Sequence, residues 1–263
     1  MISIRQGFLN QFDVNLEDLV RFKLRRTGGV NMAYSEDRGN GIRWAVMGNP
    51  NLGEVKGFLV GVENNNNDNT SNICAEVWIN ELRLSGLDEK GGWAATGRVD
   101  IQLADLGTIS VSGSARSAGF GAIEQRVNER SRENFYQFDV ATNLQLGKLL
   151  PKKAALEIPF YASYSQTVMN PEYDPYDQDI KFKDKLATVT NKDSIKNIAQ
   201  DFSAITTVNV TNMRKNKTNG KPAKIYDVSN FDVSYSYTKT ERRNPLIEND
   251  VIEKHYGGVG YNY

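Results

Sequence analysis

Apolar and polar residues alternate with a period of two from residue 93 onward. In residues 93–104, Val99 and Ile101 fall on one side of an extended chain, and Arg98 and Asp100 fall on the other. Successive side chains of a β-strand point to opposite faces, so this alternation predicts a strand with one apolar and one polar face.

The same alternation predicts six more strands further along the chain. They are expected at residues 108–116, 136–146, 156–165, 204–211, 231–238 and 258–263. The strand at 204–211 has the weakest pattern, and Pro159 interrupts the one at 156–165, because proline cannot donate a hydrogen bond to a neighbouring strand. Strands of about 9–11 residues are long enough for a tilted crossing of a lipid bilayer.

The connections between the predicted strands differ in length in a regular way. They are short at 105–107 and 147–153, long at 117–134 and 166–203, intermediate at 212–224, and longer again at 239–255. Short and long connections alternate in membrane β-barrels, where turns on one side of the membrane are tight and those on the other are extended.

The apolar positions themselves favour a membrane barrel. They mix aromatic residues with glycine and alanine, and they contain no dense leucine, isoleucine and valine core. Aromatic residues near predicted strand ends resemble the girdles that barrels place at the two bilayer interfaces. These residues are Trp93, Tyr136, Tyr164 and Tyr237.

A soluble antiparallel sandwich is the alternative that the alternation leaves open, because one face of its sheets packs on a core and the other faces water. In that case the protein would be a periplasmic or cell-surface binding module. Its ligand would be a glycan that stacks on exposed aromatic rings, and the candidates are Trp44, Trp78 and Trp93.

Residues 1–90 have a different pattern and predict a small β-sandwich or plug-like segment. An amphipathic turn or helix is expected at residues 14–24, followed by strands at 43–47, 55–62 and 76–84. Gly91 and Gly92 mark the boundary to the second domain, residues 91–263. The fold class expected is therefore all-β: a partial set of antiparallel strands from a very large outer-membrane β-barrel, preceded by the sandwich-like segment.

One short helix is expected in the longest loop, with Ile195, Ile198 and Phe202 on one side. The same loop carries the carboxylates of residues 172–179. Oxygen ligands suit calcium, but the spacing matches no established calcium loop, so no metal is predicted.

Composition excludes several other classes of function. Lys plus Arg equals 32, as does Asp plus Glu, so the net charge gives no reason to expect nucleic acid as a partner. Cys74 and His255 are the only residues of their kinds, which leaves no thiolate metal cluster or internal disulfide. Residues 119–121 begin like a dinucleotide-binding loop, but Glu124 occupies the third glycine position. We therefore expect neither an enzyme nor a cofactor.

The two ends of the sequence suggest a piece of a longer exported protein. The first residues contain no apolar stretch of signal-peptide length, and the last residues stop within an alternating pattern. We therefore expect an internal fragment.

Several segments resemble the SprA/Sov family, the outer-membrane translocon of the type IX secretion system in Bacteroidetes, which is also linked to gliding motility. The resemblance covers most of residues 47–263 and is less clear in 1–46. It is carried by residues 76–84 (EVWINELRL), 91–95 (GGWAA), 97–105 (GRVDIQLAD), 119–121 with 125–126, 130–134, 141–148 (ATNLQLGK), 170–175 (NPEYDP) and 256–263 (YGGVGYNY).

This resemblance implies a pore in the cell outer membrane that passes folded cargo proteins to the cell surface. The partners implied are secreted cargo proteins, an outer-membrane shuttle protein, a periplasmic plug, a motor complex and the lipid bilayer. The polar positions would line the lumen: Arg98, Asp100, Gln102, Asp139, Asn143 and Gln145. The apolar positions would face lipid: Val99, Ile101, Val111, Val140, Leu144 and Phe160.

Overall fold

The computed structural model divides into two compact units. The first comprises Met1–Glu89 with Tyr176–Ile180, and the second comprises Lys90–Pro175 with Lys181–Tyr263. Each unit is described by itself. The residues that the structure describes are 2–5, 13–27, 29–39, 41–61, 74, 76, 78, 80–86, 90–217 and 224–263.

The first unit contains one helix and one small sheet. Helix α1 (Leu16–Leu24) begins at Asn15, whose side chain accepts a hydrogen bond from the backbone N–H of Glu17. This bond satisfies one of the free N–H groups of the first turn. The strands β1 (Ile2–Arg5), β2 (Tyr34–Asp37) and β3 (Arg43–Val46) pair antiparallel in the order β1-β3-β2.

A compact apolar cluster holds the helix and the sheet of the first unit together. Phe22 of α1 is fully buried and contacts Trp44 edge-to-face, with ring centroids 5.8 Å apart. Leu19 and Val46 complete the buried cluster. The helix expected at residues 14–24 and the strand expected at 43–47 are confirmed.

The β-sandwich expected for residues 1–90 is wrong for the part of this unit that is described. Residues 55–61 form no strand, nor do the described residues between 74 and 86; Val62, Val77 and Ile79 lie outside the described residues. Leu59 is 98% exposed and Trp78 is 86% exposed. The apolar residues here resemble a strand in sequence, but they have no partner strand to pack against.

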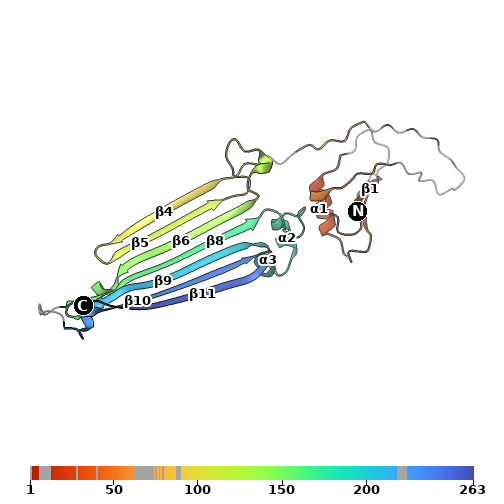
Figure 1. Ribbon diagram of the computed structural model, residues 1–263. Helices are drawn as coiled ribbons and strands as arrows, with labels where there is room; N and C mark the ends of the chain where they lie inside the picture. The colour runs from red at the N-terminus through yellow and green to blue at the C-terminus, as the bar shows by residue number, and fades with distance from the viewer. Residues whose placement is uncertain are drawn as a thin grey trace. The chain divides into compact units, whose positions relative to one another are not determined.

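The second unit is a single antiparallel sheet built from seven long strands and one short one (Figure 1). The order along the sheet is β11-β10-β9-β8-β6-β5-β4, and β7 pairs with the end of β9. The strands are β4 (Ala94–Leu103), β5 (Gly107–Arg116), β6 (Glu133–Gln145), β7 (Leu156–Glu157), β8 (Pro159–Pro171), β9 (Asp201–Lys215), β10 (Phe231–Asn244) and β11 (Ile247–Tyr261).

Short helices lie in the connections between these strands. They are η2 (Val127–Glu129), η3 (Leu146–Leu149), η4 (Lys152–Ala154), α2 (Phe182–Thr188), α3 (Lys192–Ala199) and η5 (Val228–Asn230), while η1 (Leu52–Glu54) belongs to the first unit. The helix expected in the longest loop is α3, which contains Ile195 and Ile198; Phe202 instead belongs to β9. None of the described helices is long and apolar enough to cross a membrane.

The antiparallel all-β fold of this unit is confirmed, and every long strand except β4 is longer than the alternation indicated. The sheet is open, because β4 and β11 form its two edges and do not pair with each other. Below, the 105 end is the end of the sheet at the β4–β5 turn, and the 245 end is the end at the β10–β11 turn.

The long sixth connection expected at 239–255 is wrong. Residues 239–244 continue β10, residues 247–255 belong to β11, and Pro245 and Leu246 make the turn between them. Some of the charged side chains that made this segment resemble a loop form ion pairs within it. Lys239, for example, forms ion pairs with Glu241 and Glu253.

A β-bulge in β9 keeps the apolar side chains before and after it on one face of the sheet. The register between β9 and β10 shifts between the pairs Val210–Tyr235 and Met213–Val233. Asn212 adopts a left-handed backbone (φ 53°), and its N–H donates to the Ser234 hydroxyl at 2.9 Å. The extra residue of this bulge places Met213 on the same face as Val210, which strict alternation would not allow.

Candidate functional surface: the two faces of the sheet

The pairing register collects the predicted polar residues on one side of the sheet, called here the polar face. Residues opposite one another on successive strands form a row. One such row contains Arg98, Ser112, Asp139 and Ser165. The six predicted lumen residues all lie on this face: Arg98, Asp100, Gln102, Asp139, Asn143 and Gln145.

The charges of β4 are satisfied within the polar face. The guanidinium of Arg98 donates to the carboxylate of Asp100, with Nε 2.9 Å from Oδ2. The hydroxyl of Ser110 donates to Oδ1 of Asp100 at 2.6 Å across the β4–β5 pair. Both side chains remain exposed, and their opposite charges cancel at the surface of the sheet.

The polar residues of β6 are held in a similar way. Asp139 accepts hydrogen bonds from the amide of Gln137 at 2.9 Å and from the hydroxyl of Ser165. Asn143 lies opposite Thr108 on one side and Tyr161 on the other. The carboxylates of Asp100 and Asp139 on this face are thus already hydrogen-bonded.

Sequence reasoning overlooked these serine partners. Ser110 and Ser165 were expected on the polar side, but alternation gives no information on which residues face each other across strands. Register alone makes them partners of Asp100 and Asp139. Hydroxyl residues recur along this face elsewhere, as where Ser236 donates to Asn209 at 2.6 Å.

The opposite side of the sheet, called here the apolar face, carries the other predicted set. Val99 and Ile101 of β4 are 59% and 45% exposed. All six predicted lipid-facing residues share this face: Val99, Ile101, Val111, Val140, Leu144 and Phe160. Which face meets lipid stays a prediction at this point.

Neither face is covered by a second sheet within the described residues of this unit. Ala204 is the one described strand residue of the sheet that is both apolar and buried. Helix α3 contacts β10, and its residues include Lys192, Asp193 and Lys196. The sheet therefore has two exposed faces of opposite character and no apolar core of its own.

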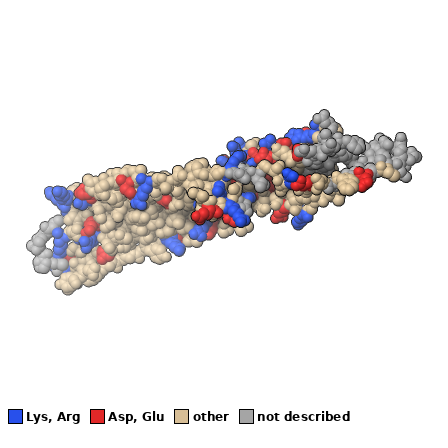
Figure 2. Space-filling view, turned by 90° about the horizontal axis from the view of Figure 1, so that it is seen from above, with Lys and Arg blue, Asp and Glu red and all other residues tan. Residues whose placement is uncertain are grey.

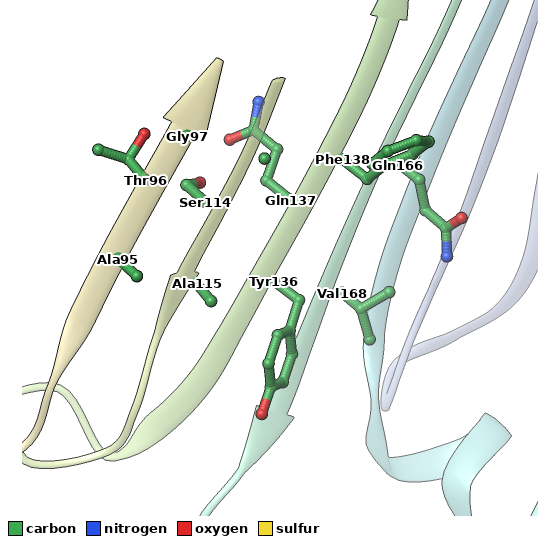
Figure 3. A pocket seen from close by; sticks show the side chains of 11 residues that line it. Ala95, Thr96, Gly97, Ser114, Ala115, Tyr136, Gln137, Phe138, Gln166 and Val168 are labelled. Carbon is green, nitrogen blue, oxygen red and sulfur yellow. The ribbon is translucent and has the colours of Figure 1, made fainter. Parts of the chain in front are cut away.

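A shallow depression of about 610 Å³ lies where β4 and β5 carry small residues (Figure 3). Ala95, Gly97 and Ala115 form its floor, and the rings of Tyr136 and Phe138 stand beside them. No atom lies within 4 Å of the position that a side chain on Gly97 would occupy. The depression is open, and none of the residues that line it is charged.

His255 lies in the middle of β11 on the apolar face. Its Nδ1 is 2.9 Å from the hydroxyl of Tyr235, and its ring centroid is 4.8 Å from that of Tyr237. Its ring contacts among the described residues are with Tyr235 and Tyr237. It belongs to a cluster of amphipathic rings.

The 105 end of the sheet carries a set of ion pairs (Figure 2, left). Asp105 in the β4–β5 turn is 3.1 Å from Nζ of Lys148, and this hydrogen bond holds the pKa of Asp105 below its ordinary value. Lys217 lowers the pKa of Asp227 in the same manner. The first pair joins two different connections, and the second closes the connection between β9 and β10 on itself.

Glycine residues in the second connection serve close packing. Gly119 has a left-handed backbone (φ 83°), and a side chain there would lie 2.7 Å from the carbonyl of Lys90. A side chain on Gly92 would lie 2.2 Å from the backbone nitrogen of Phe120. The glycines that resembled a phosphate-binding loop thus allow two backbone segments to meet.

Three of the carboxylates of residues 172–179 pair with lysines, namely Asp174, Asp177 and Asp179. In the first unit, Lys23 lies 3.0 Å from Oδ1 of Asp179, and both side chains are buried. Oδ2 of the same carboxylate accepts the backbone N–H of Leu52 at 3.2 Å. In the second unit, the buried Asp174 pairs with Lys185.

The three tryptophans proposed for glycan binding differ in solvent exposure. Trp44 is 8% exposed in the core of the first unit, while Trp78 and Trp93 are exposed. Arg38 already stacks over the Trp44 ring at 4.2 Å. A sugar could not reach Trp44 without unfolding that core.

The sequence profile of a family described as motility related/secretion protein (SprA_N) matches residues 9–186, which is more than half of the chain. The chain belongs to this SprA family. The matched span includes residues 9–46, where the resemblance seen in the sequence was weaker. No curated protein matches the chain.

Proposed function

We propose that the second unit is part of the wall of an outer-membrane β-barrel, the protein-conducting pore of a type IX secretion system. Its polar face would line the lumen through which folded cargo passes, and its apolar face would contact lipid. The observation that carries the proposal is the sheet with two exposed faces of opposite character.

The apolar face needs a nonpolar environment. Contiguous exposed apolar surface on a soluble protein marks an interaction site or leads to aggregation. Here the exposed residues extend over several strands, from Val99 on β4 to Phe138 on β6 and Val233 on β10. Lipid is the environment that would match an apolar face of this length, since strands of about 9–11 residues cross a bilayer when tilted.

The polar face suits the passage of proteins with different surfaces. Arg98 and Asp100 neutralise each other, and Asp139 is held by Gln137 and Ser165. These charged groups are therefore already paired where a passing protein would meet them. Cargo would therefore slide along the polar face without binding.

The two open edges fit a wall segment better than a complete fold. Each edge strand, β4 and β11, leaves backbone N–H and C=O groups without sheet partners within the described residues. In lipid, unpaired backbone groups cost several kcal/mol each, so membrane sheets close into barrels. Further strands would complete this wall at both edges.

Family membership supplies the rest of the proposal. Besides cargo, the partners would be the outer-membrane shuttle protein, the periplasmic plug and the motor complex, and the chain would perform no catalytic step. The role in motility would follow from export of surface proteins.

In-cell photocrosslinking tests this function. A photoreactive amino acid placed at Asn143 on the polar face should capture cargo proteins in transit. The neighbouring residue Leu144, on the apolar face, is the matched control and should capture none. Equal capture at both positions, or none at either while secretion continues, would contradict the proposed lumen wall.

A further inference from the structure

A single row of the apolar face changes character from one edge of the sheet to the other. The row begins with Val99, Val111 and Val140 on the first three strands. It ends with Lys239 on β10 and Glu253 on β11. The residues between them are Tyr164 and Thr206.

Charged residues continue from this row toward the 245 end. Lys239 lies 3.9 Å from Glu253, and Glu241 and Arg243 follow at the next positions of β10 on this face. On β4 and β5, positions of the same rows are glycine or alanine: Glu241 shares a row with Gly97 and Gly113. The border between apolar and charged residues is therefore oblique to the rows.

Aromatic residues follow the same oblique line. Trp93 immediately precedes β4, Tyr136 lies in the row of Ala95, and Tyr164 lies in the row of Val99. Tyr237 and His255 lie in the row of Ile101. From β4 through β6 and β8 to β10, the aromatic position moves toward the 105 end, and on β11 it stays in the row of Tyr237. The aromatics expected near strand ends are therefore not all there, since Tyr164 and Tyr237 lie in the interior of their strands.

The slope of this line follows from standard strand geometry. Trp93 lies eight residues before Ile101, which corresponds to about 27 Å along the strand at about 3.4 Å per residue. Five strand spacings separate β4 from β10, or about 24 Å at about 4.8 Å each. The line thus crosses the strands at about 45°.

We propose that this line, from Trp93 through Tyr136 and Tyr164 to Tyr237 and His255, is the contact of the apolar face with the lipid headgroup layer. The inference rests on the proposed function and adds the orientation of the sheet in the bilayer. Strands of membrane barrels are tilted by about 35–45°, so a headgroup boundary must cross their rows obliquely.

The chemistry along the line suits headgroups. Tyrosine, tryptophan and histidine have an apolar ring and a polar tip, and such rings concentrate at the membrane–water interface. The Tyr235 hydroxyl and His255 form a polar contact at 2.9 Å beside the Tyr237 ring. Lys239 and Glu253 lie on the 245 side of these rings, where phosphate groups and water would surround them.

Depth-dependent fluorescence quenching on the full-length protein in phosphatidylcholine vesicles tests the inference. In a background where Cys74 and every other native cysteine are replaced by serine, a polarity-sensitive fluorophore is attached at Val99→Cys or at Glu253→Cys. These positions share one row. The label at 99 should be quenched several-fold more by spin-labelled acyl chains than the label at 253, and aqueous iodide should show the reverse order. A label at Ser112→Cys, on the polar face, should respond to iodide alone.

The outcomes separate this inference from the proposed function. If acyl-chain quenchers reach 99 and 253 equally, the boundary follows the rows, and the oblique line is wrong while the barrel stands. If acyl-chain quenchers reach the label at 253 more than the label at 99, the oblique line is also wrong while the barrel stands. If they reach neither position in protein that shows heat-shifted mobility, the apolar face does not meet lipid, and both proposals fail.

Discussion

The hydroxyl of Ser110 donates a hydrogen bond of 2.6 Å to Asp100, directly across the β4–β5 pair. Together with Arg98, it satisfies the carboxylate within the polar face, on the side of β4 opposite to Val99 and Ile101. One face of β4 therefore carries polar groups and the other carries apolar groups. The same kind of substitution should then have opposite effects on the two faces.

A lysine at Val99 should impair membrane insertion. If this position lies near the bilayer midplane, a charged residue on the lipid face costs roughly 2–4 kcal/mol. Ser112→Lys, on the polar face of the adjacent strand, is the matched control and should fold within about 1 kcal/mol of the unsubstituted protein. Urea unfolding in vesicles measures both. A larger loss for Ser112→Lys than for Val99→Lys would mean that the faces are inverted.

Replacing Asp100 with leucine should leave insertion intact, because the residue is exposed and its neighbours stay hydrated. The effect should instead be on transport, since the leucine side chain would add apolar surface to the proposed lumen and leave Arg98 unpaired. The expected result is normal heat-shifted mobility with slower appearance of cargo at the cell surface. Loss of the folded form would show that Asp100 is needed for structure.

Lys148→Met should change the response of the 105 end to acid. Lys148 holds the pKa of Asp105 below its ordinary value, so the charged pair stabilises the fold above that ordinary pKa. This contribution is lost as the pH falls through the lowered folded-state pKa. The unfolding midpoints of the two proteins should therefore differ at neutral pH and converge under acid conditions. A constant difference across that range would exclude this ion pair as the cause.

The bulge at Asn212 should tolerate glycine but not valine. A β-branched residue in the left-handed backbone conformation costs about 1–2 kcal/mol, whereas glycine adopts it freely. Urea unfolding should show that loss for Asn212→Val, and little change for Asn212→Gly. If the two variants unfold alike, the positive φ of Asn212 is not required for the fold.

The first unit offers a test that is independent of the membrane. Lys23→Met would leave Asp179 buried without its cation, which costs about 3–5 kcal/mol for a buried pair. Arg25→Met removes a more exposed pair with Glu36 and should cost under about 1 kcal/mol. Proteolysis within residues 176–180 should therefore accelerate for Lys23→Met. Equal cleavage of the two variants would show that the buried pair does not hold this segment.

Alternation in the sequence was sufficient to predict the strands of the second unit, because two-faced strands must repeat every second residue. Val99 and Asp100 were assigned to opposite faces on this basis. The continuation of β10 was missed, because Lys239 resembles a loop residue unless its partner Glu253 is known. Cross-strand pairing depends on register, which single-strand patterns do not contain.

In the first unit, an apolar pattern predicted strands that the chain does not form in its described residues. The apolar residues around Leu59 have the composition of a strand, yet they form none, because a strand requires a partner. Helix α1 was predictable, since Asn15 and the spacing of Leu19 and Phe22 specify its start and its buried side locally. Likewise, the serines that hold Asp100 and Asp139 could be assigned to a face but not to a partner.

The most direct test of the barrel wall is fractionation of the protein from its native cells. Outer membranes are isolated, washed at alkaline pH, and analysed by electrophoresis with and without boiling. We predict that the protein stays in the membrane pellet and migrates differently when it is not boiled, as a folded barrel does. Release into the soluble fraction by the wash, with no change in mobility on boiling, would contradict the account.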